Sequence, residues 1–355
     1  MKNDITIVKV GSNTIVDDSG NIRMEIVRDI VTSLQNIIKN GGRVVLVTSG
    51  AVRLGRVALG KDTPATVAAS VGQTHLFAAY YQEAEKINLK LAEFLLTRPY
   101  IVTREYFLKL QETFNSLLDQ GILPIVNEND ALVVHTDWSL GDNDSLSAIL
   151  AISLKAKRLI ILSHIEGLFD ADPSKDKNAK LIQVVEDVNN ELLKQCSSEV
   201  SSGGRGGMLS KLKAARLVTA VGIETRIVSG LTEGNLAKAL NNENIGTTFL
   251  PRKSNENISN RDRWLLAAKN SAGSIEIDDG AVTALKKGKS LLAVGVKNVS
   301  GQFNKKEIVE IVDTEHRGIA FGIVDYSSSE IKELLDTKNI KDVQLMHTDN
   351  MITIQ

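Results

Sequence analysis

The segment ITIVKVGSN, residues 5–13, joins a short, β-branched apolar run to a lysine and a glycine turn. Residues 24–40 then carry their apolar side chains in one helical stripe, which predicts a helix that ends at Gly41 and Gly42. The next apolar run, RVVLV at 43–47, shows no alternation with polar residues. Strands that are buried on both faces have this pattern, and they occur in parallel sheets covered by helices.

The same alternation of strand and helix continues to about residue 250. Further strands are expected at 89–96, 122–126, 158–162 and 225–228, and helices at 104–120, 145–156 and 208–221. This order predicts an α/β fold with an open, mainly parallel sheet and helices on both faces. Ligands of such folds bind beyond the carboxyl ends of the strands.

The character of the sequence changes after residue 252. The stretch KSNENISNRDR at 253–263 is polar and has no periodicity, as is typical of a linker. We therefore predict a first domain at 1–252, a linker at 253–271 and a small β-barrel-like domain at 272–355. The strands of this second domain are expected at 274–277, 291–299, 307–312, 318–325 and 342–347, with one helix at 329–337.

Composition excludes several classes of protein. The 355 residues have a formal net charge of −1, and the single cysteine, Cys196, permits no intramolecular disulfide. The five histidines show no metal-ligand spacing, so we expect no metal site made by the protein. No apolar run reaches the ~20 residues of a membrane helix, and no signal peptide opens the chain. We expect a cytoplasmic protein that has no membrane contact.

Polar or glycine-rich clusters stand where the expected strands end or the following helices begin. They are KVGSN at 9–13, TSGAV at 48–52, VNEND at 126–130, GDNDS at 141–145 and GGRGGMLSK at 203–211. A lysine at a strand end and a glycine-rich run into a helix can both hold phosphate oxygens. The two carboxylates of GDNDS need a nearby cation, because like charges at one helix start repel each other.

Each cluster also has a simpler explanation. Lys9 can be a solvated residue at a strand end, and Ser49 or Asp144 can be an ordinary helix cap. The glycine-rich run can be a surface loop. Neither a Walker A loop nor a dinucleotide-binding fingerprint is present.

Taken together, these segments resemble the amino acid kinase family, and within it the members that phosphorylate the side-chain carboxylate of glutamate. The matching segments keep the family's order and spacing over nearly the whole first domain: KVGSN, VTSGAV, VNENDA, GDNDSLSA, LSHIEGLFDADP and GRGGMLSKLKAA. The tail, through GSIEIDDGA and SLLAVGVKNVSG, resembles a PUA domain.

The resemblance implies a role for each matching residue. It implies that Lys9, Asp144 and Lys211 are catalytic, with Asp144 positioning the two lysines. The residues it implies for glutamate are Ser49, Asn127, Asp130 and Asn143. The residues it implies for ATP are Lys9, Ser163, His164, Arg205, Gly206, Gly207, Met208, Leu209, Ser210 and Lys211. The family usually has Thr-Asp where this chain has Ser163-His164.

The reaction that the resemblance implies is transfer of phosphate from ATP, with Mg²⁺, to the side chain of L-glutamate. Its products are L-glutamyl 5-phosphate and ADP, and it opens proline biosynthesis. The resemblance also implies feedback inhibition by proline and a homo-oligomer. A carboxylate is already ionised at neutral pH, so the reaction needs positioning and charge neutralisation rather than a general base.

Two other functions remain possible from the sequence. One is another amino acid kinase, acting on aspartate or acetylglutamate. The other is an RNA-binding protein that uses the PUA-like tail. Residues 272–355 contain 10 Lys and Arg against 13 Asp and Glu, whereas RNA binding usually needs a basic face. We therefore expect no nucleic acid partner.

Overall fold

The computed structural model of the chain describes residues 4–132, 140, 142–173, 175–197, 207–251, 259–267, 273–337 and 342–353. The chain divides into two compact units. The first unit contains residues 1–100 and 105–256, and the second contains residues 101–104 and 257–355.

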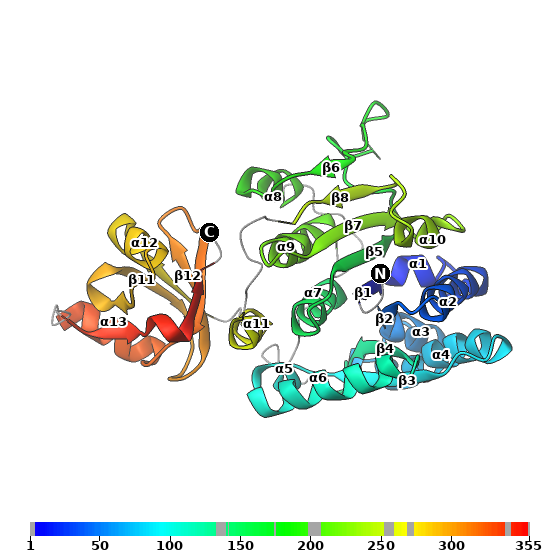
Figure 1. Ribbon diagram of the computed structural model, residues 1–355, viewed down its shortest axis with the longest axis horizontal. Coiled ribbons are helices and arrows are strands. Elements are labelled where there is room, and N and C mark those ends of the chain that lie inside the picture. The colour runs from blue at the N-terminus through cyan, green and yellow to red at the C-terminus, as the bar shows by residue number, and fades with distance from the viewer. Residues whose placement is uncertain are drawn as a thin grey trace. The chain divides into compact units, whose positions relative to one another are not determined.

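An eight-stranded sheet forms the centre of the first unit (Figure 1). All neighbouring strands are parallel except β7 and β8, which are antiparallel. The strands, in their order across the sheet, are β3 (Leu91–Leu96), β4 (Leu123–Glu128), β2 (Arg43–Val47), β1 (Ile5–Val10), β5 (Arg158–Ser163), β7 (Glu224–Ser229), β8 (Thr247–Phe249) and β6 (Val184–Val185). The predicted mainly parallel α/β fold is confirmed.

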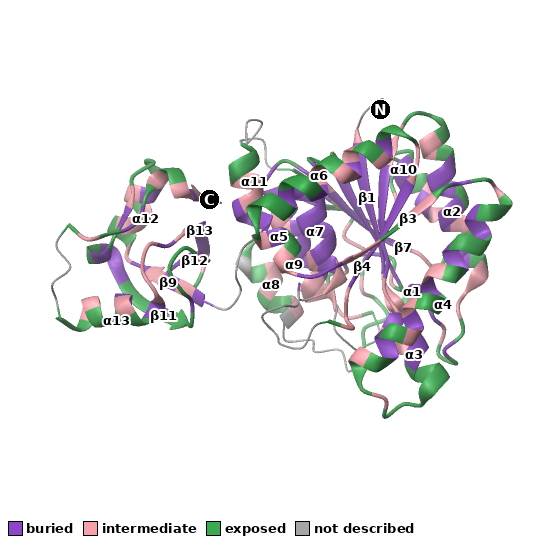
Figure 2. Ribbon diagram, turned by 90° about the horizontal axis from the view of Figure 1, so that it is seen from below, coloured by how far each residue is buried: buried purple, intermediate pink, exposed green. Residues whose placement is uncertain are grey.

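Helices cover both faces of this sheet. Figure 1 shows α7 and α9 on one face and α2 and α10 on the other, and Figure 2 shows the strands buried between these layers. The helices of the unit are α1 (Ser12–Ile15), α2 (Met24–Lys39), α3 (Ala51–Leu59), α4 (Ala65–Lys86), α6 (Arg104–Asp119), α7 (Asn143–Ser153), α8 (Asn190–Ser197), α9 (Met208–Thr219) and α10 (Asn235–Leu240). The short helix α5 (Pro99–Val102) has its first two residues in this unit and its last two among the residues of the second. Strand β1 is buried along its whole length, which explains why four of its six residues are isoleucine or valine.

The second unit contains a five-stranded sheet in the order β11-β9-β12-β13-β15 and a separate pair, β10 with β14. A compact apolar core, which includes Ile275, Val309 and Leu345, holds it together. Its elements are α11 (Asn260–Ala267), β9 (Gly273–Ile277), α12 (Asp279–Lys286), β10 (Leu291–Leu292), β11 (Val296–Gly301), β12 (Ile308–Asp313), β13 (Gly318–Ile323), α13 (Ser328–Thr337), β14 (Gln344–Met346) and β15 (Met351–Thr353).

The structure differs from the sequence-based prediction in the expected linker. Residues 260–267 form helix α11, which packs against β13 and β15 of the second unit. Its last turn buries Leu265, Leu266 and Ala267, so the prediction of a linker is wrong there. Only this one turn is apolar, and it leaves too short a stripe to indicate a helix in the sequence.

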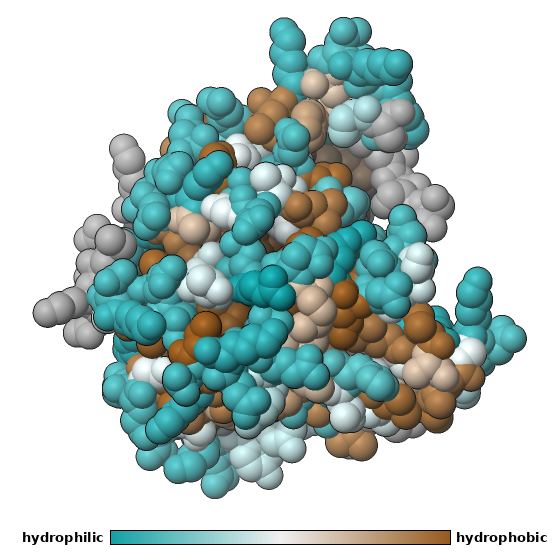
Figure 3. All heavy atoms as spheres, turned by 90° about the vertical axis from the view of Figure 1, so that its right-hand side faces the viewer, coloured by the Kyte–Doolittle hydropathy of each residue, from teal (hydrophilic) through white to brown (hydrophobic). Residues whose placement is uncertain are grey.

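The sequence analysis also missed helix α4, which has 22 residues. Its small apolar residues lie all around the helix rather than on one stripe, so no period of 3.6 was visible. Figure 3 views the molecule from the side of Figure 1 where α2, α3 and α4 lie, and brown apolar atoms gather low on this face. The exposed apolar residues of α3 and α4 are Val57, Leu59, Val67 and Tyr81.

Two glycines let α3 and α4 approach backbone to backbone. A Cβ atom on Gly55 would lie 1.8 Å from the carbonyl oxygen of Ala68, and one on Gly72 would lie 1.8 Å from the carbonyl oxygen of Ala51. Neither carbonyl belongs to a flexible side chain, so any larger residue would force the two helices apart. This crossing fixes the start of α3, which follows the TSG cluster at the end of β2.

Gly72→Ala should therefore lower the free energy of unfolding by about 1–3 kcal/mol or more, although alanine favours a helix over glycine. The measurement is urea-induced unfolding of the parent protein and the variant. Glu85→Ala, on the exposed surface of the same helix, is the control and should change the value by less than about 0.5 kcal/mol. Equal midpoints for Gly72→Ala and the parent would show that the crossing tolerates a methyl group.

Candidate active site

Three charged side chains meet at the carboxyl edge of the central strands. Asp144 Oδ1 lies 2.7 Å from Lys9 Nζ, and Asp144 Oδ2 lies 3.2 Å from Lys211 Nζ. Lys9 is the fifth residue of β1, Asp144 the second of α7 and Lys211 the fourth of α9. At least 96% of each residue's surface is buried, since Lys9 and Lys211 are 4% exposed and Asp144 1%. The simpler explanation of Lys9 as a solvated lysine at a strand end is therefore wrong.

The electrostatics of this triad favour a negatively charged ligand. Burial alone would raise the pKa of Asp144, but Lys9 and Lys211 outweigh it and hold the pKa below its usual value, so the carboxylate stays ionised. Burial lowers the pKa of Lys211; Asp144 opposes this effect, and the charge of Lys9 adds to it. Lys9 and Lys211 share the carboxylate of Asp144, and the charge of Asp142 also acts on Lys211. An anion between the lysines would stabilise both of their charged forms.

Asp142, and not Asp144, caps helix α7. Its Oδ1 accepts a hydrogen bond of 2.8 Å from the backbone amide of Ser145, and its Oδ2 accepts one from the hydroxyl of Ser210. One carboxylate thereby ties the start of α7 to the first turn of α9. Both helix N-termini are held at the triad, where their dipoles also favour an anion. The simpler explanation of Asp144 as a cap is wrong.

A line of amide side chains leads away from the triad. Asn143 donates from Nδ2 to Ser49 Oγ at 2.8 Å and to Asn127 Oδ1 at 3.0 Å. Asn127 donates to Gln73 Oε1 at 2.8 Å, and Gln73 donates to Glu93 Oε1 at 2.7 Å. Helix α3 is capped at Gly50 without a side-chain bond, so Ser49 is not the cap that the simpler explanation required.

The ends of this line fix the direction of every amide in it. The carboxylate of Glu93 can only accept, and the backbone amide of Glu128 can only donate, which it does to Asn127 Oδ1 at 2.9 Å. Asn143 must therefore turn its NH₂ group toward Ser49 and Asn127. Its Oδ1 is left buried, without a hydrogen-bond partner among the described residues. The site presents an acceptor at this point, which suits an N–H donor of a ligand.

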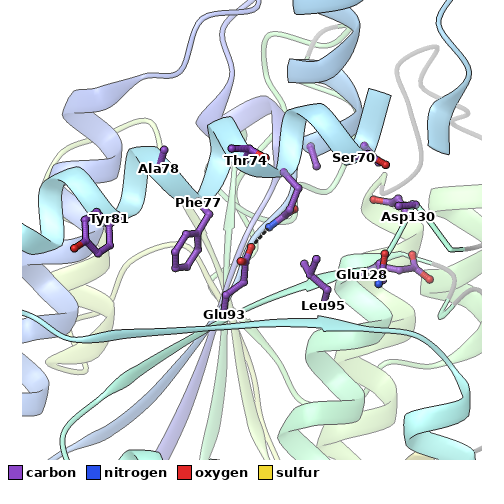
Figure 4. Close-up of a pocket in the computed structure, with 14 residues that line it drawn as sticks. Ser70, Thr74, Phe77, Ala78, Tyr81, Glu93, Leu95, Glu128 and Asp130 are labelled. Carbon is purple, nitrogen blue, oxygen red and sulfur yellow. Dashed lines mark hydrogen bonds between the residues drawn. The ribbon is translucent and has the colours of Figure 1, made fainter. Parts of the chain in front are cut away.

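A cavity of about 660 Å³ adjoins this line, between α4 and the ends of β3 and β4. Figure 4 shows Glu93, Glu128 and Asp130 along one side and Phe77 and Tyr81 along the other, with the bond from Gln73 to Glu93 crossing it. Asp130, predicted to bind glutamate, thus lies on the wall of the cavity. Ser49, Asn127 and Asn143 bond to one another beside it.

The residues predicted for ATP lie at the ends of β5 and at the start of α9. Ser163 ends β5; it is 2% exposed, and its hydroxyl oxygen has no partner in the described part of the chain. His164 follows it; one side of the residue is exposed, but partial removal of its ring from water, and then the charges of Lys211 and Lys9, lower its pKa. Its imidazole is therefore neutral at neutral pH. The helix α9 carries Met208, Leu209, Ser210 and Lys211 after its N-cap Gly207. Arg205 and Gly206 lie outside the described residues.

A metal-binding cluster is not found in the described ranges, where no three of the His, Cys, Asp and Glu side chains are grouped to hold an ion. Likewise, none of the described helices has the length and apolar character needed to cross a membrane.

Three residues of the site were not assigned a role from the sequence: Asp142, Gln73 and Glu93. Asp142 stood in the GDNDS cluster, and its place two residues before Asp144 is the signal that could have indicated the cap. Gln73 lies on helix α4, which the sequence did not reveal, and Glu93 lies on the edge strand β3. Only the folded chain brings them to Asn127.

The arrangement is a buried site that favours an anion, built at the carboxyl edge of a mainly parallel α/β sheet. Residues 4–229 match the family model described as amino acid kinase family, and residues 273–343 match the model described as PUA domain. The chain belongs to the amino acid kinase family.

Curated relatives that match nearly the whole chain carry the name glutamate 5-kinase. The glutamate 5-kinase of Pelobacter propionicus (strain DSM 2379 / NBRC 103807 / OttBd1) is 36% identical over 365 residues, which cover 98% of this chain and 97% of the relative. The glutamate 5-kinase of Haemophilus influenzae (strain 86-028NP) is 36% identical over 370 residues, which cover all of both chains. Among solved structures, the carbamate kinase from Giardia lamblia bound to AMP-PNP has a TM-score of 0.51 at 18% identity, over 70% of this chain and 99% of that one. This likeness shows the shared fold.

Replacing Asp144 tests whether the triad is held by charge. Asp144→Asn should lower the free energy of unfolding at pH 7 by about 3–5 kcal/mol, because it leaves two buried ammonium groups without a counter-charge. The measurement is denaturant-induced unfolding of the parent and the variant over a range of pH.

The pH dependence of this difference has a definite sign. The pKa of Asp144 is lowered from 3.8 in the folded protein, so its stabilising contribution is complete above about pH 3.8 and is lost as the pH falls through the folded value. The gap between parent and Asp144→Asn should therefore narrow as the pH falls below 3.8. A difference in the free energy of unfolding that stays constant until both proteins unfold in acid would mean that the shape of Asn, and not its lack of charge, destabilises the variant.

Proposed function

We propose that this protein transfers the γ-phosphoryl group of ATP to the side-chain carboxylate of L-glutamate, giving L-glutamyl 5-phosphate and ADP. The observation that carries the proposal is the buried triad of Lys9, Asp144 and Lys211 at the start of two helices. Curated relatives with the name glutamate 5-kinase, at 36% identity over nearly the whole chain, support the choice of substrate.

The chemistry asks for charge neutralisation. A carboxylate oxygen attacks the γ-phosphorus and the bond to the β,γ-bridging oxygen breaks, so two anions must approach each other. Lys9 and Lys211 stand 2.7 Å and 3.2 Å from the same carboxylate, which holds their ammonium groups a short distance apart. We propose that the phosphoryl group in transfer lies against both. The nucleophile is ionised at neutral pH, so no residue has to remove a proton.

The amide line supplies the proposed recognition of the amino acid. Asn143 Oδ1 is an unpartnered buried acceptor, and the α-ammonium group of glutamate is a donor that matches it. Asp130, on the wall of the neighbouring cavity, would attract the same positive charge. Ser49 and Asn127 keep the Asn143 side chain in place. An N-acylated amino acid lacks the charged ammonium group and should bind poorly.

Mg²⁺ is part of the proposal as an ion that enters with the ATP phosphates. It would supply positive charge to the β- and γ-phosphoryl oxygens. Asp144 is already engaged by two lysines, and Mg²⁺ commonly binds through substrate phosphates and water with few protein ligands. Ser163, with its free buried hydroxyl, and the first turn of α9 would contact the nucleotide.

Four further features belong to the same proposal. We propose a first domain and a PUA-like second domain that correspond to the two compact units. We propose inhibition by proline, the end product of the pathway that this reaction opens, and a cytoplasmic location, where ATP and glutamate are available. We also propose a homo-oligomer, because β3 lies at the edge of the sheet and α4 exposes Val67 and Tyr81.

A substrate panel tests the reaction. ADP release in the presence of Mg²⁺ and ATP should be stimulated by L-glutamate, and far less by L-aspartate, whose carboxylate is one methylene nearer the ammonium group that Asn143 receives. N-Acetyl-L-glutamate should also be poor. Equal rates with aspartate or acetylglutamate would show that another amino acid kinase activity is the correct one. Adding proline to the glutamate reaction tests the proposed inhibition.

Removal of one lysine tests the role of the triad. Lys211→Ala should lower kcat by roughly 10²–10³-fold, as loss of one preorganised charge-stabilising group does. Asp144 keeps Lys9 as a partner, so the variant should fold. Lys213→Ala, an exposed lysine on the same helix, is the matched control and should keep the parent rate. A folded Lys211→Ala protein with normal turnover would place Lys211 outside the reaction.

A further inference from the structure

One buried hydroxyl group beside the triad is not explained by the interactions of the folded chain. Thr14, in the short helix α1, is 0% exposed, and its Oγ1 has no hydrogen-bond partner among the described residues. A buried polar group without a partner destabilises a protein, and most such groups are paired. Nothing in the sequence or in the proposed roles above assigned a function to this residue.

The side chain of Thr14 is held in one orientation. Its methyl group Cγ2 faces Gly230, where a Cβ atom would approach it to 2.6 Å. Threonine is branched at Cβ and has few rotamers, so a methyl group fixed on one side fixes the hydroxyl on the other. The backbone is held as well, because Arg23 donates to the carbonyl oxygens of Asn13, Thr14 and Val16 at 2.8, 3.2 and 3.0 Å.

The hydroxyl points to the space above Gly11, next to Lys9. A Cβ atom placed on Gly11 would lie 3.7 Å from Thr14 Oγ1 and 3.8 Å from Lys9 Nζ, and 3.6 Å from the carbonyl oxygen of Leu162, which already accepts a hydrogen bond from the Gly11 amide. The hydroxyl and the ammonium group therefore border the same small volume, which Gly11 leaves free of a side chain. Both are donors, and both are buried. An oxyanion in this volume could accept from the two at once.

We propose that Thr14 Oγ1 donates a hydrogen bond to the terminal phosphoryl group of the bound nucleoside triphosphate, beside Lys9. This inference rests on the proposed phosphoryl transfer, but not on the identity of the acceptor. The hydroxyl is left unpaired in the free protein and becomes paired when the triphosphate binds. Thr14 is thus a phosphate-binding residue, and its hydrogen bond contributes free energy only in the complex with the triphosphate.

This assignment makes stability and binding change in opposite directions. Valine has the shape of threonine without the hydroxyl, so Thr14→Val removes a buried unpaired group and should not lower the melting temperature of the free protein. The same change removes a hydrogen bond to a charged phosphoryl oxygen. It should weaken binding of the triphosphate by about 10-fold to 100-fold.

Thr225→Val is the matched control. Thr225 is also 0% exposed, and its Oγ1 is also without a partner in the described part of the chain. It is the second residue of β7, however, and so lies at the amino end of the strand, whereas Ser229 lies at the carboxyl end. It should respond as Thr14 does in melting temperature and should leave nucleotide binding unchanged. Thr14→Ser, which keeps a hydroxyl, should retain most of the parent affinity.

The experiment is isothermal titration of the full chain with Mg²⁺ and either AMP-PNP or ADP, without glutamate. For Thr14→Val we expect a higher Kd for AMP-PNP, that is, weaker binding. The Kd for ADP, which lacks the terminal phosphoryl group, should be unchanged. Unchanged binding of AMP-PNP, or an equal loss for both nucleotides, would overturn the assignment to that group. If Thr14→Val does not fold, Thr14→Ala is compared in the same way.

The same titrations separate this inference from the proposed reaction. A parent protein that binds AMP-PNP but does not phosphorylate glutamate would contradict the proposed substrate and leave the Thr14 result interpretable. A parent protein that binds neither nucleotide would contradict both.

Discussion

The pairing of one buried carboxylate with two buried lysines is the interaction on which the site depends. Ionised groups are costly to bury without a partner. Burial of Lys9, Asp144 and Lys211 is therefore favourable only when all three side chains are in contact. They come from a strand and two helices that are far apart in the chain. Asp142 secures the arrangement by joining the starts of the two helices. Two buried ammonium groups that share one carboxylate favour an anion beside them, and this is the basis of the proposed phosphoryl transfer.

Hydrogen-bond direction is a second constraint, and it acts over a longer distance. A carboxylate on edge strand β3 and a backbone amide at the end of β4 determine which way Gln73, Asn127 and Asn143 turn their amide groups. The consequence appears at Asn143, which offers an oxygen to the site. Such a line converts amide groups that could face either way into a site of one polarity, which offers an acceptor at Asn143 Oδ1.

Small residues make room for both constraints. Gly55 and Gly72 let α3 and α4 touch through their backbones, and α4 carries Gln73 directly after the contact. Two other glycines make room around Thr14. Gly11 leaves space beside its hydroxyl and Lys9, and Gly230 leaves space for its methyl group. Positions that have no side chain therefore decide where the functional side chains of their neighbours point.

The sequence by itself determined the class of fold, because unbroken apolar runs alternating with helical stripes are local patterns. Its pattern also indicated polar clusters at strand ends and helix starts, and within them the family resemblance singled out Lys9, Ser49, Asn127, Asp130, Asn143, Asp144 and Lys211. The sequence did not reveal α4, whose small residues form no stripe, or α11, whose apolar turn is too short. It left open whether Asp144 was a cap or the partner of two lysines. Only the tertiary structure decided these points and the contacts of Asp142, Gln73, Glu93 and Thr14, since burial, hydrogen-bond direction and an unpaired hydroxyl arise from residues that meet only after the chain has folded.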